Sequence, residues 1–133
     1  MPAMSAARQA LGELGERIAE RWLVARGWSV LDRRFRSGHR DIDLVTAMVE
    51  RVGCGRTVAF VEVKARAGDA FGGPVAAVGW RKRRELGRSA WVWVDRHGRP
   101  GDAYRFDVVG VLLAGRRVRV CHVSDAFALR GWP

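Results

Sequence analysis

The chain has 133 residues, 48% of them hydrophobic, and carries 24 Lys and Arg against 14 Asp and Glu, a formal net charge of +10. This length and composition predict a single domain over residues 1–133 that buries roughly two-thirds of its unfolded surface, and the basic surplus favours nucleic acid over a membrane as the partner. No apolar run approaches the length of a membrane-spanning helix, which excludes a protein that crosses a membrane by helices.

The first predicted element is an amphipathic helix. Ser5 is a favourable N-cap residue, and the helix is expected to run to about Arg26, with Gly27 as its stop. Residues 1–8 are expected to form a flexible tail. The apolar residues that recur at helical spacing in this segment are Leu11, Leu14, Ile18 and Trp22.

Strands and one further helix follow. Two strands, WSVLDRRFR and DIDLVTAM, are predicted before a connection with two glycines, and a third strand then pairs back in a meander. A glycine-rich loop leads to a helix with a crowded basic start. The predicted ranges are strands at 28–36, 41–48 and 57–66, a helix around 80–95, strands at 104–112 and 117–123, and a short terminal helical turn at 125–129. The element order is therefore α-β-β-β-α-β-β.

The third predicted strand, TVAFVEVKAR, combines an apolar pattern with an acid and a base. Glu62 and Lys64 are two residues apart, so both side chains lie on the same face of the strand. Asp41 and Asp43 share a face of the preceding strand in the same way. If the two strands are neighbours with Asp43 near Glu62, then both carboxylates and Lys64 converge at one end of the sheet.

Such a cluster has a chemical use. Neighbouring carboxylates repel and raise each other's pKa, and a divalent cation relieves that repulsion; oxygen ligands suit Mg²⁺ or Mn²⁺. The ion activates water and stabilises charge on a phosphate, while Lys64 orients or deprotonates that water or offsets charge in the transition state. The alternative is an ordinary cross-strand ion pair, but unpaired charges in apolar strands are expensive.

Lysine is rare among the basic residues. Of the 24, only Lys64 and Lys82 are lysine, and the rest are arginine. Arginine stays protonated in proteins, whereas the environment can shift the pKa of a lysine until it loses or shares its proton. Under this bias, each of the two lysines suggests a chemical reason for its presence.

An acid at the end of one strand followed by E-x-K on the next resembles the PD-(D/E)xK nuclease superfamily, which has the restriction-endonuclease-like fold. More closely, the chain resembles the YraN family of bacterial proteins, which is related to archaeal Holliday-junction resolvases. The segments that carry this resemblance are GERIAERWL (15–23), RGWSVLDRRFR (26–36), DIDLV (41–45), FVEVKAR (60–66), FGGP (71–74), RKRREL (81–86), RFDVV (105–109) and HVSDAF (122–127).

The resemblance implies a three-layer α/β fold, with a central mixed sheet of about five strands flanked by helices. It implies that Asp43 and Glu62 bind the metal, with the backbone carbonyl of Val63 as a further ligand. Lys64 would be the catalytic lysine, and Glu16 would be the helix acid that completes the site in resolvase-like members.

The resemblance also implies a nucleic-acid surface and one additional acid. Lys82 matches a basic helix position that approaches the scissile phosphate or the strand. The other basic residues expected to contact nucleic acid are Arg66, Arg81, Arg83 and Arg84. Asp41 is a candidate additional acid: the family usually has Gly-Glu where this chain has Arg40-Asp41, which keeps the charge but shortens its reach.

The leading hypothesis is a metal-dependent endonuclease or junction-processing nuclease that acts on structured DNA with Mg²⁺ or Mn²⁺. Two alternatives remain open: a non-catalytic nucleic-acid-binding module, and a basic interaction protein of a DNA-repair, uptake or RNA assembly. A homodimer is expected by analogy with junction resolvases. The first residues, MPAMSAARQA, lack the apolar core of a signal peptide, and Cys54 and Cys121 are expected to be free thiols, so a cytoplasmic location is expected.

Overall fold

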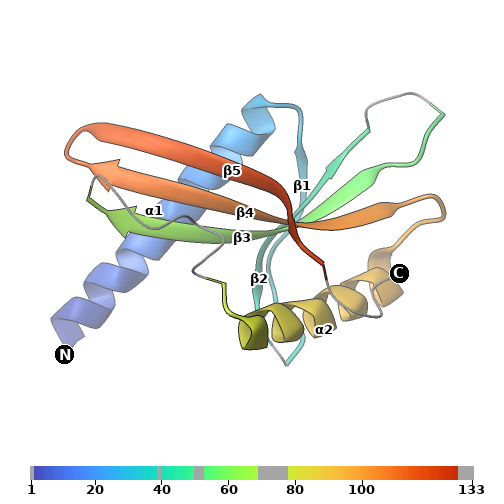
Figure 1. Ribbon diagram of the computed structural model, residues 1–133, viewed down its shortest axis with the longest axis horizontal. Coiled ribbons are helices and arrows are strands. Elements are labelled where there is room, and N and C mark those ends of the chain that lie inside the picture. Colours follow the sequence, from blue (N-terminus) through green and yellow to red (C-terminus); the bar gives the residue numbers. More distant parts are fainter. Residues whose placement is uncertain (1, 39, 50–52, 69–77, 129–133) are drawn as a thin grey trace.

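A computed structural model describes residues 2–38, 40–49, 53–68 and 78–128. In it a five-stranded sheet is flanked by two helices (Figure 1). The elements are α1 (Pro2–Ala25), β1 (Ser29–Phe35), β2 (Ile42–Met48), β3 (Thr57–Ala67), α2 (Trp80–His97), β4 (Ala103–Ala114) and β5 (Arg117–Phe127). This confirms the predicted order α-β-β-β-α-β-β and a three-layer α/β architecture consistent with the restriction-endonuclease-like fold.

Two predicted boundaries differ from the structure. Helix α1 begins at Pro2, so Ser5 lies within it, and residues 2–8, expected as a flexible tail, are helical. Proline is tolerated in a first turn because its missing N–H has no partner there. The helical turn predicted at 125–129 is wrong for residues 125–127, because β5 continues to Phe127 with a register shift opposite β4; Leu129 lies outside the described residues.

The strand order is β1-β2-β3-β4-β5, and only the β3–β4 pair is parallel. A parallel pair needs a crossover, which the segment containing α2 provides. The ladder between β2 and β3 ends at Leu44 and Val61, whereas β3 stays paired with β4 as far as Ala67. The sheet therefore forks: β1 and β2 diverge from the other three strands, as Figure 1 shows.

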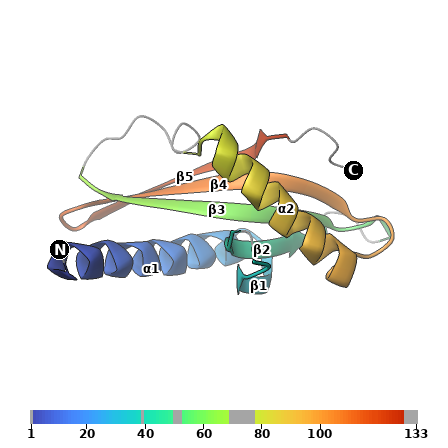
Figure 2. The same cartoon turned by 90° about the horizontal axis from the view of Figure 1, so that it is seen from below.

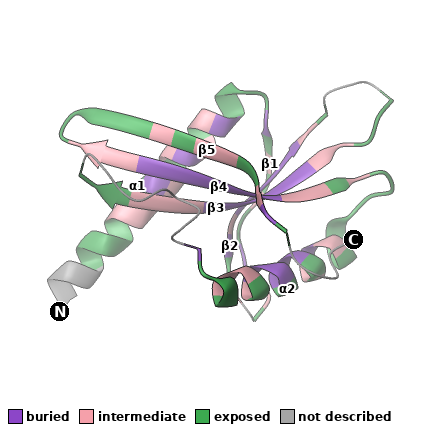
Figure 3. Ribbon diagram, viewed as in Figure 1, coloured by how far each residue is buried: buried purple, intermediate pink, exposed green. Residues whose placement is uncertain are grey.

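A hydrophobic cluster lies on each side of the sheet. Helix α1 packs Ala19 and Leu23 against strand residues that include Val61. Helix α2 packs Leu86 and Trp93 on the other side, against a cluster of apolar and aromatic strand residues. Figure 2 shows the two helices running in different directions on different sides of the strands. Figure 3 shows the buried residues concentrated at the centre of the sheet.

Two expectations drawn from composition can be compared with the fold. Neither described helix has the length and apolar character that crossing a membrane requires. Cys54 and Cys121 are both exposed and free, which confirms the expectation of free thiols.

Helix α1 lies very close to β3 at Gly15. A Cβ atom built on Gly15 would lie only 2.5 Å from the Cβ of Ala65, closer than real side chains come. Gly12, about one turn earlier, has open space around the same position. Gly15 and Ala65 therefore set the distance between the helix and the strand, and the next residue of the helix, Glu16, depends on that distance.

Replacing Gly15 by alanine should destabilise the fold. Overpacking of this kind costs about 1–3 kcal/mol, which outweighs the gain of about 1 kcal/mol in helix propensity. The matched control is Gly12→Ala, which receives the propensity gain without the contact and should be more stable than the wild type. Urea unfolding measures both variants, and Ala65→Gly should restore the stability of Gly15→Ala. Equal stabilisation by both alanine substitutions would contradict the close approach.

Candidate active site

Asp43 lies at the end of the β2–β3 ladder. The last pair, Leu44 with Val61, places Asp43 opposite Glu62 by register. The Oδ2 atom of Asp43 accepts a hydrogen bond from the backbone N–H of Val63 at 2.8 Å. The N–H and C=O of one strand residue point to the same neighbouring strand, so the Val63 carbonyl lies on the Asp43 side as well. The structure thus brings Asp43, Glu62 and Val63 together, as the strand pairing required.

Glu62 is buried, with 6% of its surface exposed, and it is shared by two lysines. The Nζ atom of Lys64 lies 3.4 Å from Oε1 of Glu62, and the Nζ atom of Lys82, from α2, contacts the same oxygen. A buried carboxylate is stable only when it is paired and hydrogen-bonded. The two lysines of the chain therefore meet at a single buried acid.

Asp43 and the two lysines of this cluster have shifted pKa values. Burial raises the pKa of Asp43 to about 8, and the charge of Glu62 raises it too, while the Val63 N–H opposes the shift. Burial lowers the pKa of Lys64, and the neighbouring Lys82 lowers it further. For Lys82, burial acts to lower the pKa, but the charge and hydrogen bond of Glu62, together with smaller effects of Lys64 and Asp43, outweigh it, so the pKa is raised. Lys64 is thus the lysine that gives up its proton more readily.

Glu16 joins the cluster from α1. Its carboxylate is close enough to Asp43 to contribute to the raised pKa of that residue. Its Oε2 atom also accepts hydrogen bonds from Nη2 and Nε of Arg34, at 3.0 and 3.2 Å. The structure therefore places Glu16 beside Asp43, where the resemblance put the helix acid.

Arg34 is a residue that the sequence reasoning missed. It lies on β1 between the pairs Arg33–Leu44 and Phe35–Ile42, which places it opposite Asp43 on β2. Its φ of 49° is unusual for a residue other than glycine. Its guanidinium holds Glu16, so we assign it a positioning role. The only sequence signal was its place in the RGWSVLDRRFR segment.

Helix α2 braces the segment that enters β2. The buried hydroxyl of Ser89 accepts a hydrogen bond from the Arg40 N–H at 3.2 Å and donates one to the Arg40 carbonyl at 2.6 Å. Nε of Arg40 donates to Glu85 at 2.6 Å. Lys82, Glu85 and Ser89 are spaced three and four residues apart, so they share one face of the helix. This face of α2 therefore contacts Glu62 through Lys82 and supports Arg40, which lies three residues before Asp43.

Asp41, the candidate additional acid, lies at the surface. Its side chain is 47% exposed and pairs with Arg36 at 3.3 Å. Alternation put Asp41 and Asp43 on one face of a predicted strand, but β2 begins only at Ile42. Asp41 therefore precedes the strand, where alternation no longer fixes its direction.

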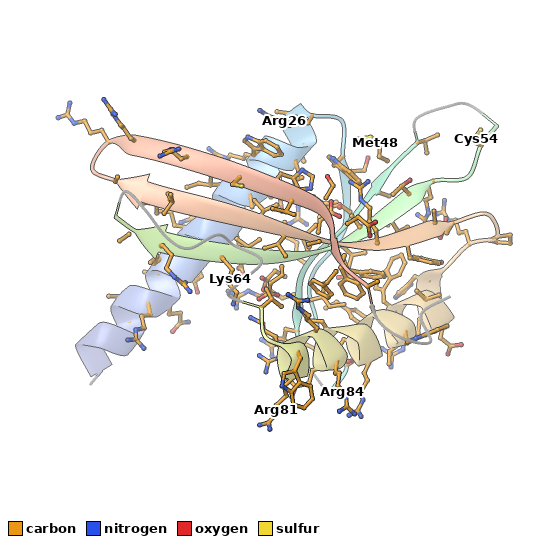
Figure 4. The ribbon with its side chains drawn as sticks, in the orientation of Figure 1. Arg26, Met48, Cys54, Lys64, Arg81 and Arg84 are labelled. Carbon is orange, nitrogen blue, oxygen red and sulfur yellow. The ribbon has the colours of Figure 1, made fainter. Side chains whose placement is uncertain are left out.

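The other basic residues expected at the nucleic acid fall into two groups. Arg81 and Arg84 are exposed at the start of α2, and Arg66 is exposed near the end of β3. In Figure 4, Arg81 and Arg84 project from α2 away from the sheet, with Lys64 on the strand side of that helix. Arg83 is engaged within the fold: its Nε donates to the Val78 carbonyl at 2.8 Å, and its guanidinium lies 5.0 Å from the centre of the Phe127 ring.

Two surface depressions lead to the cluster. One, of about 460 Å³, lies between α1 and β1 and is lined by residues that include Asp43, Glu16 and Arg34. The other, of about 580 Å³, lies between the first half of α1 and β3 and is lined by residues that include Lys64 and Arg8. The fork of the sheet is thus open to solvent on the acid side and on the lysine side.

The cluster fits Mg²⁺ or Mn²⁺ only with an incomplete protein shell. Over the described ranges, no three Asp, Glu, His or Cys side chains form a full ligand group. Asp43 and Glu62 nevertheless repel each other, as the raised pKa of Asp43 shows, and a divalent cation relieves that repulsion. Mg²⁺ commonly uses one or two carboxylates and keeps several waters. Asp43, Glu62 and the Val63 carbonyl suit that mode of binding.

The fold and the arrangement of an acid before E-x-K define an α/β protein of the restriction-endonuclease-like type. Residues 15–111 match the sequence model of "Uncharacterised protein family UPF0102". UPF0102 proteins of Trichlorobacter lovleyi and Anaeromyxobacter dehalogenans are 38% and 40% identical to this chain, over 97% and 95% of it and over 98% and 90% of their own lengths. One from Rhodococcus jostii is 38% identical over 89% of this chain and 96% of its own. The chain therefore belongs to the UPF0102 family, the YraN family, which confirms the resemblance carried by its motifs.

The raised pKa of Asp43 predicts a pH-dependent stability in the presence of a chelator. Because the folded state raises this pKa from 3.8 to about 8, the protonated carboxyl is favoured, and stability is lost as the pH rises through that interval. Asp43→Asn removes this titration. The difference in free energy of unfolding between the Asp43→Asn variant and the wild type should therefore increase in favour of the variant as the pH rises from about 5 to 8. The expected increase is at least about 1.4 kcal/mol, the value of one pKa unit.

Urea unfolding in EDTA at several pH values provides the measurement. The matched control is Asp41→Asn, which removes an exposed carboxylate just two residues away and should run parallel to the wild type across the same pH range. A constant difference between Asp43→Asn and the wild type would show that Asp43 does not titrate in this interval.

Proposed function

We propose that this protein is a metal-dependent endonuclease or junction-processing nuclease that hydrolyses phosphodiester bonds in structured DNA in the cytoplasm. The observation that carries the proposal is the convergence of Asp43, Glu62 and Lys64 at the fork between β2 and β3. It is supported by the second lysine on the same carboxylate and by the net charge of +10, which suits a polyanionic substrate.

Each side chain has a role that follows from its place. Bound Mg²⁺ or Mn²⁺ supplies an activated water and offsets charge on the phosphate; Asp43, Glu62 and the Val63 carbonyl would hold it. Lys64, whose pKa is lowered, accepts a proton from the attacking water at Nζ. Lys82, whose pKa is raised, stays protonated and offsets negative charge on the phosphate.

Glu16 acts through Asp43. It lies beside the Asp43 carboxyl, whose pKa it raises, and is itself held by the two guanidinium hydrogen bonds of Arg34. This arrangement keeps Asp43 turned toward Val63 and Glu62. Arg34 is therefore a positioning residue in the proposed mechanism.

A non-catalytic nucleic-acid-binding module is the second candidate, because the exposed Arg81 and Arg84 at the start of α2 suit phosphate contacts without any chemistry. A module that only binds has no need of buried acids, however, and burying Asp43 and Glu62 is costly. The cost of burying Asp43 and Glu62 therefore favours an enzyme over a module that only binds. The third candidate, a basic interaction protein, would be supported by a co-purifying partner together with an absence of cleavage.

A cleavage panel tests the proposal. Linear, nicked, flap and four-way-junction DNA are each incubated with Mg²⁺, Mn²⁺ or EDTA. We expect cleavage of at least one branched substrate that depends on the metal and is absent with EDTA. Binding of these substrates without cleavage under any metal condition would favour the binding module instead. Sedimentation of the active species would test the expected homodimer.

Metal binding should depend on the two carboxylates at the fork. Titration calorimetry with Mn²⁺ should detect binding to the wild type that Asp43→Asn and Glu62→Gln lose, because each substitution removes one charged oxygen ligand. Asp41→Asn is the matched control and should bind like the wild type, since Asp41 lies at the surface. Undiminished binding by Asp43→Asn and Glu62→Gln would remove the metal site from the proposal.

Lys64→Arg separates a catalytic lysine from a structural ion pair. Arginine keeps the positive charge but does not give up its proton, so single-turnover cleavage should fall about 100-fold or more if Lys64 acts in proton transfer, while Mn²⁺ binding survives. The matched control is Arg66→Lys, two residues further on β3, which should cleave at nearly the wild-type rate. Wild-type cleavage by Lys64→Arg would identify the Glu62–Lys64 pair as an ordinary ion pair.

A further inference from the structure

The outward side of α2 carries two exposed tryptophans. Trp80 begins the helix and is 65% exposed, more than the other exposed large hydrophobic residues of the described chain, and Trp91 is 43% exposed. Exposing large aromatic surface forgoes the stabilisation that burial would give. The helix buries Trp93 on its core side, so α2 places a tryptophan inside where the fold requires one. Both Trp80 and Trp91 therefore keep a large part of their surface accessible to a ligand.

Arginines lie between and beside these tryptophans. Trp80, Arg84, Arg88 and Trp91 are spaced at i, i+4, i+8 and i+11, which puts them within a sector of roughly 80° of the helix; we call this set the Trp–Arg stripe. All four are exposed. The guanidinium carbons of Arg81 and Arg84 each lie 5.7 Å from the centre of the Trp80 ring, within the range of a cation–π contact.

The stripe is built like a surface for single-stranded nucleic acid. Such surfaces combine aromatic rings, on which bases stack, with basic side chains that follow the phosphates. The two tryptophans are about 16 Å apart along the helix axis at 1.5 Å per residue. This distance corresponds to about five nucleotide steps of 3.4 Å.

The stripe also begins next to the candidate active site. Lys82, which contacts Glu62, follows Trp80 by two residues in the same first turn of α2. Lys82 lies about 200° round the helix from Trp80, on the side that faces Glu62, so a strand that leaves the stripe and passes round this first turn would reach Lys82 and Glu62. In Figure 4 the labelled Arg81 and Arg84 mark this end of α2, close to the strand that carries Lys64.

A contact between two copies of the chain is the competing use of such a surface. A two-fold contact would bring the stripe against itself and so place Arg84 and Arg88 of one copy near those of the other. Like charges placed together disfavour that arrangement, whereas a polyanion complements it.

We propose that the Trp–Arg stripe binds an unpaired DNA strand and thereby directs the nuclease to branched or tailed DNA at the point where single strand meets duplex. This inference rests on the proposed function for its biological sense. Its test measures binding alone, with EDTA present, so that its outcome is independent of cleavage.

The experiment compares a blunt duplex with the same duplex carrying a single-stranded tail, by fluorescence anisotropy. The wild type should bind the tailed duplex more tightly. Trp80→Leu with Trp91→Leu should reduce affinity for the tailed duplex by about 5-fold or more for each lost stack and change affinity for the blunt duplex less than about two-fold. Trp80→Phe, which keeps an aromatic face, should retain most of the preference.

The charge control compares Arg84→Gln with Arg117→Gln, since Arg117 lies at the β4–β5 turn, away from α2 (Figure 1). Arg84→Gln should weaken tail binding more. The proposal is overturned if the double leucine variant keeps the wild-type preference, if it loses affinity for both DNAs equally, or if the wild type binds neither. An RNA tail bound in place of a DNA tail, or a sedimenting dimer that the leucine substitutions dissociate, also overturns it.

The two proposals fail in distinguishable ways. If the protein cleaves DNA with a metal but its preference for tailed DNA does not depend on Trp80 and Trp91, the nuclease proposal stands and the proposed role of the Trp–Arg stripe is rejected. A tail preference that depends on both tryptophans, in a protein that cuts none of the panel substrates, would keep the stripe and favour a binding module.

Discussion

The early end of the β2–β3 ladder is the constraint on which the candidate site depends. Had β2 continued to pair beyond Leu44 and Val61, a backbone carbonyl would have taken the N–H of Val63. Instead the side chain of Asp43 accepts that hydrogen bond, so a carboxylate enters the plane of the sheet beside Glu62. The same hydrogen bond thus gives the backbone N–H of Val63 an acceptor and places Asp43 next to Glu62.

Burial then determines the charge states at this fork. Two carboxylates cannot both remain charged at low cost in a buried setting, and the helices act on the two acids in opposite ways. Helix α2 supplies the positive charge of Lys82 to Glu62, whereas α1 places a third acid, Glu16, beside Asp43 and so favours the protonated form of Asp43. The reach of Glu16 depends in turn on the close approach at Gly15. Each helix therefore contributes one polar side chain to the site in addition to its share of the core.

The sequence predicted the regular elements well because its hydrophobic periodicity is strong, and it predicted the meeting of Asp43 and Glu62 because a meander fixes strand neighbours. It could not predict Arg34, whose contact with Glu16 depends on a backbone irregularity in β1. It likewise missed the Arg40–Ser89 contacts, which join residues 49 apart. The terminal turn was wrong because a register shift near Phe106 lets β5 extend, and such a shift has no composition signal.

The distribution of lysine links composition to chemistry. Arginine could supply charge, phosphate contacts and ion pairs, and this chain uses it for nearly all of them, with 22 of 24 basic residues. Yet both lysines contact the same oxygen of Glu62. A guanidinium is planar, bulky and permanently charged, whereas an ammonium is compact and able to release a proton. A structural ion pair has no need of that difference. Two ammonium groups around one buried carboxylate, one with a lowered and one with a raised pKa, are what proton transfer beside a fixed positive charge requires.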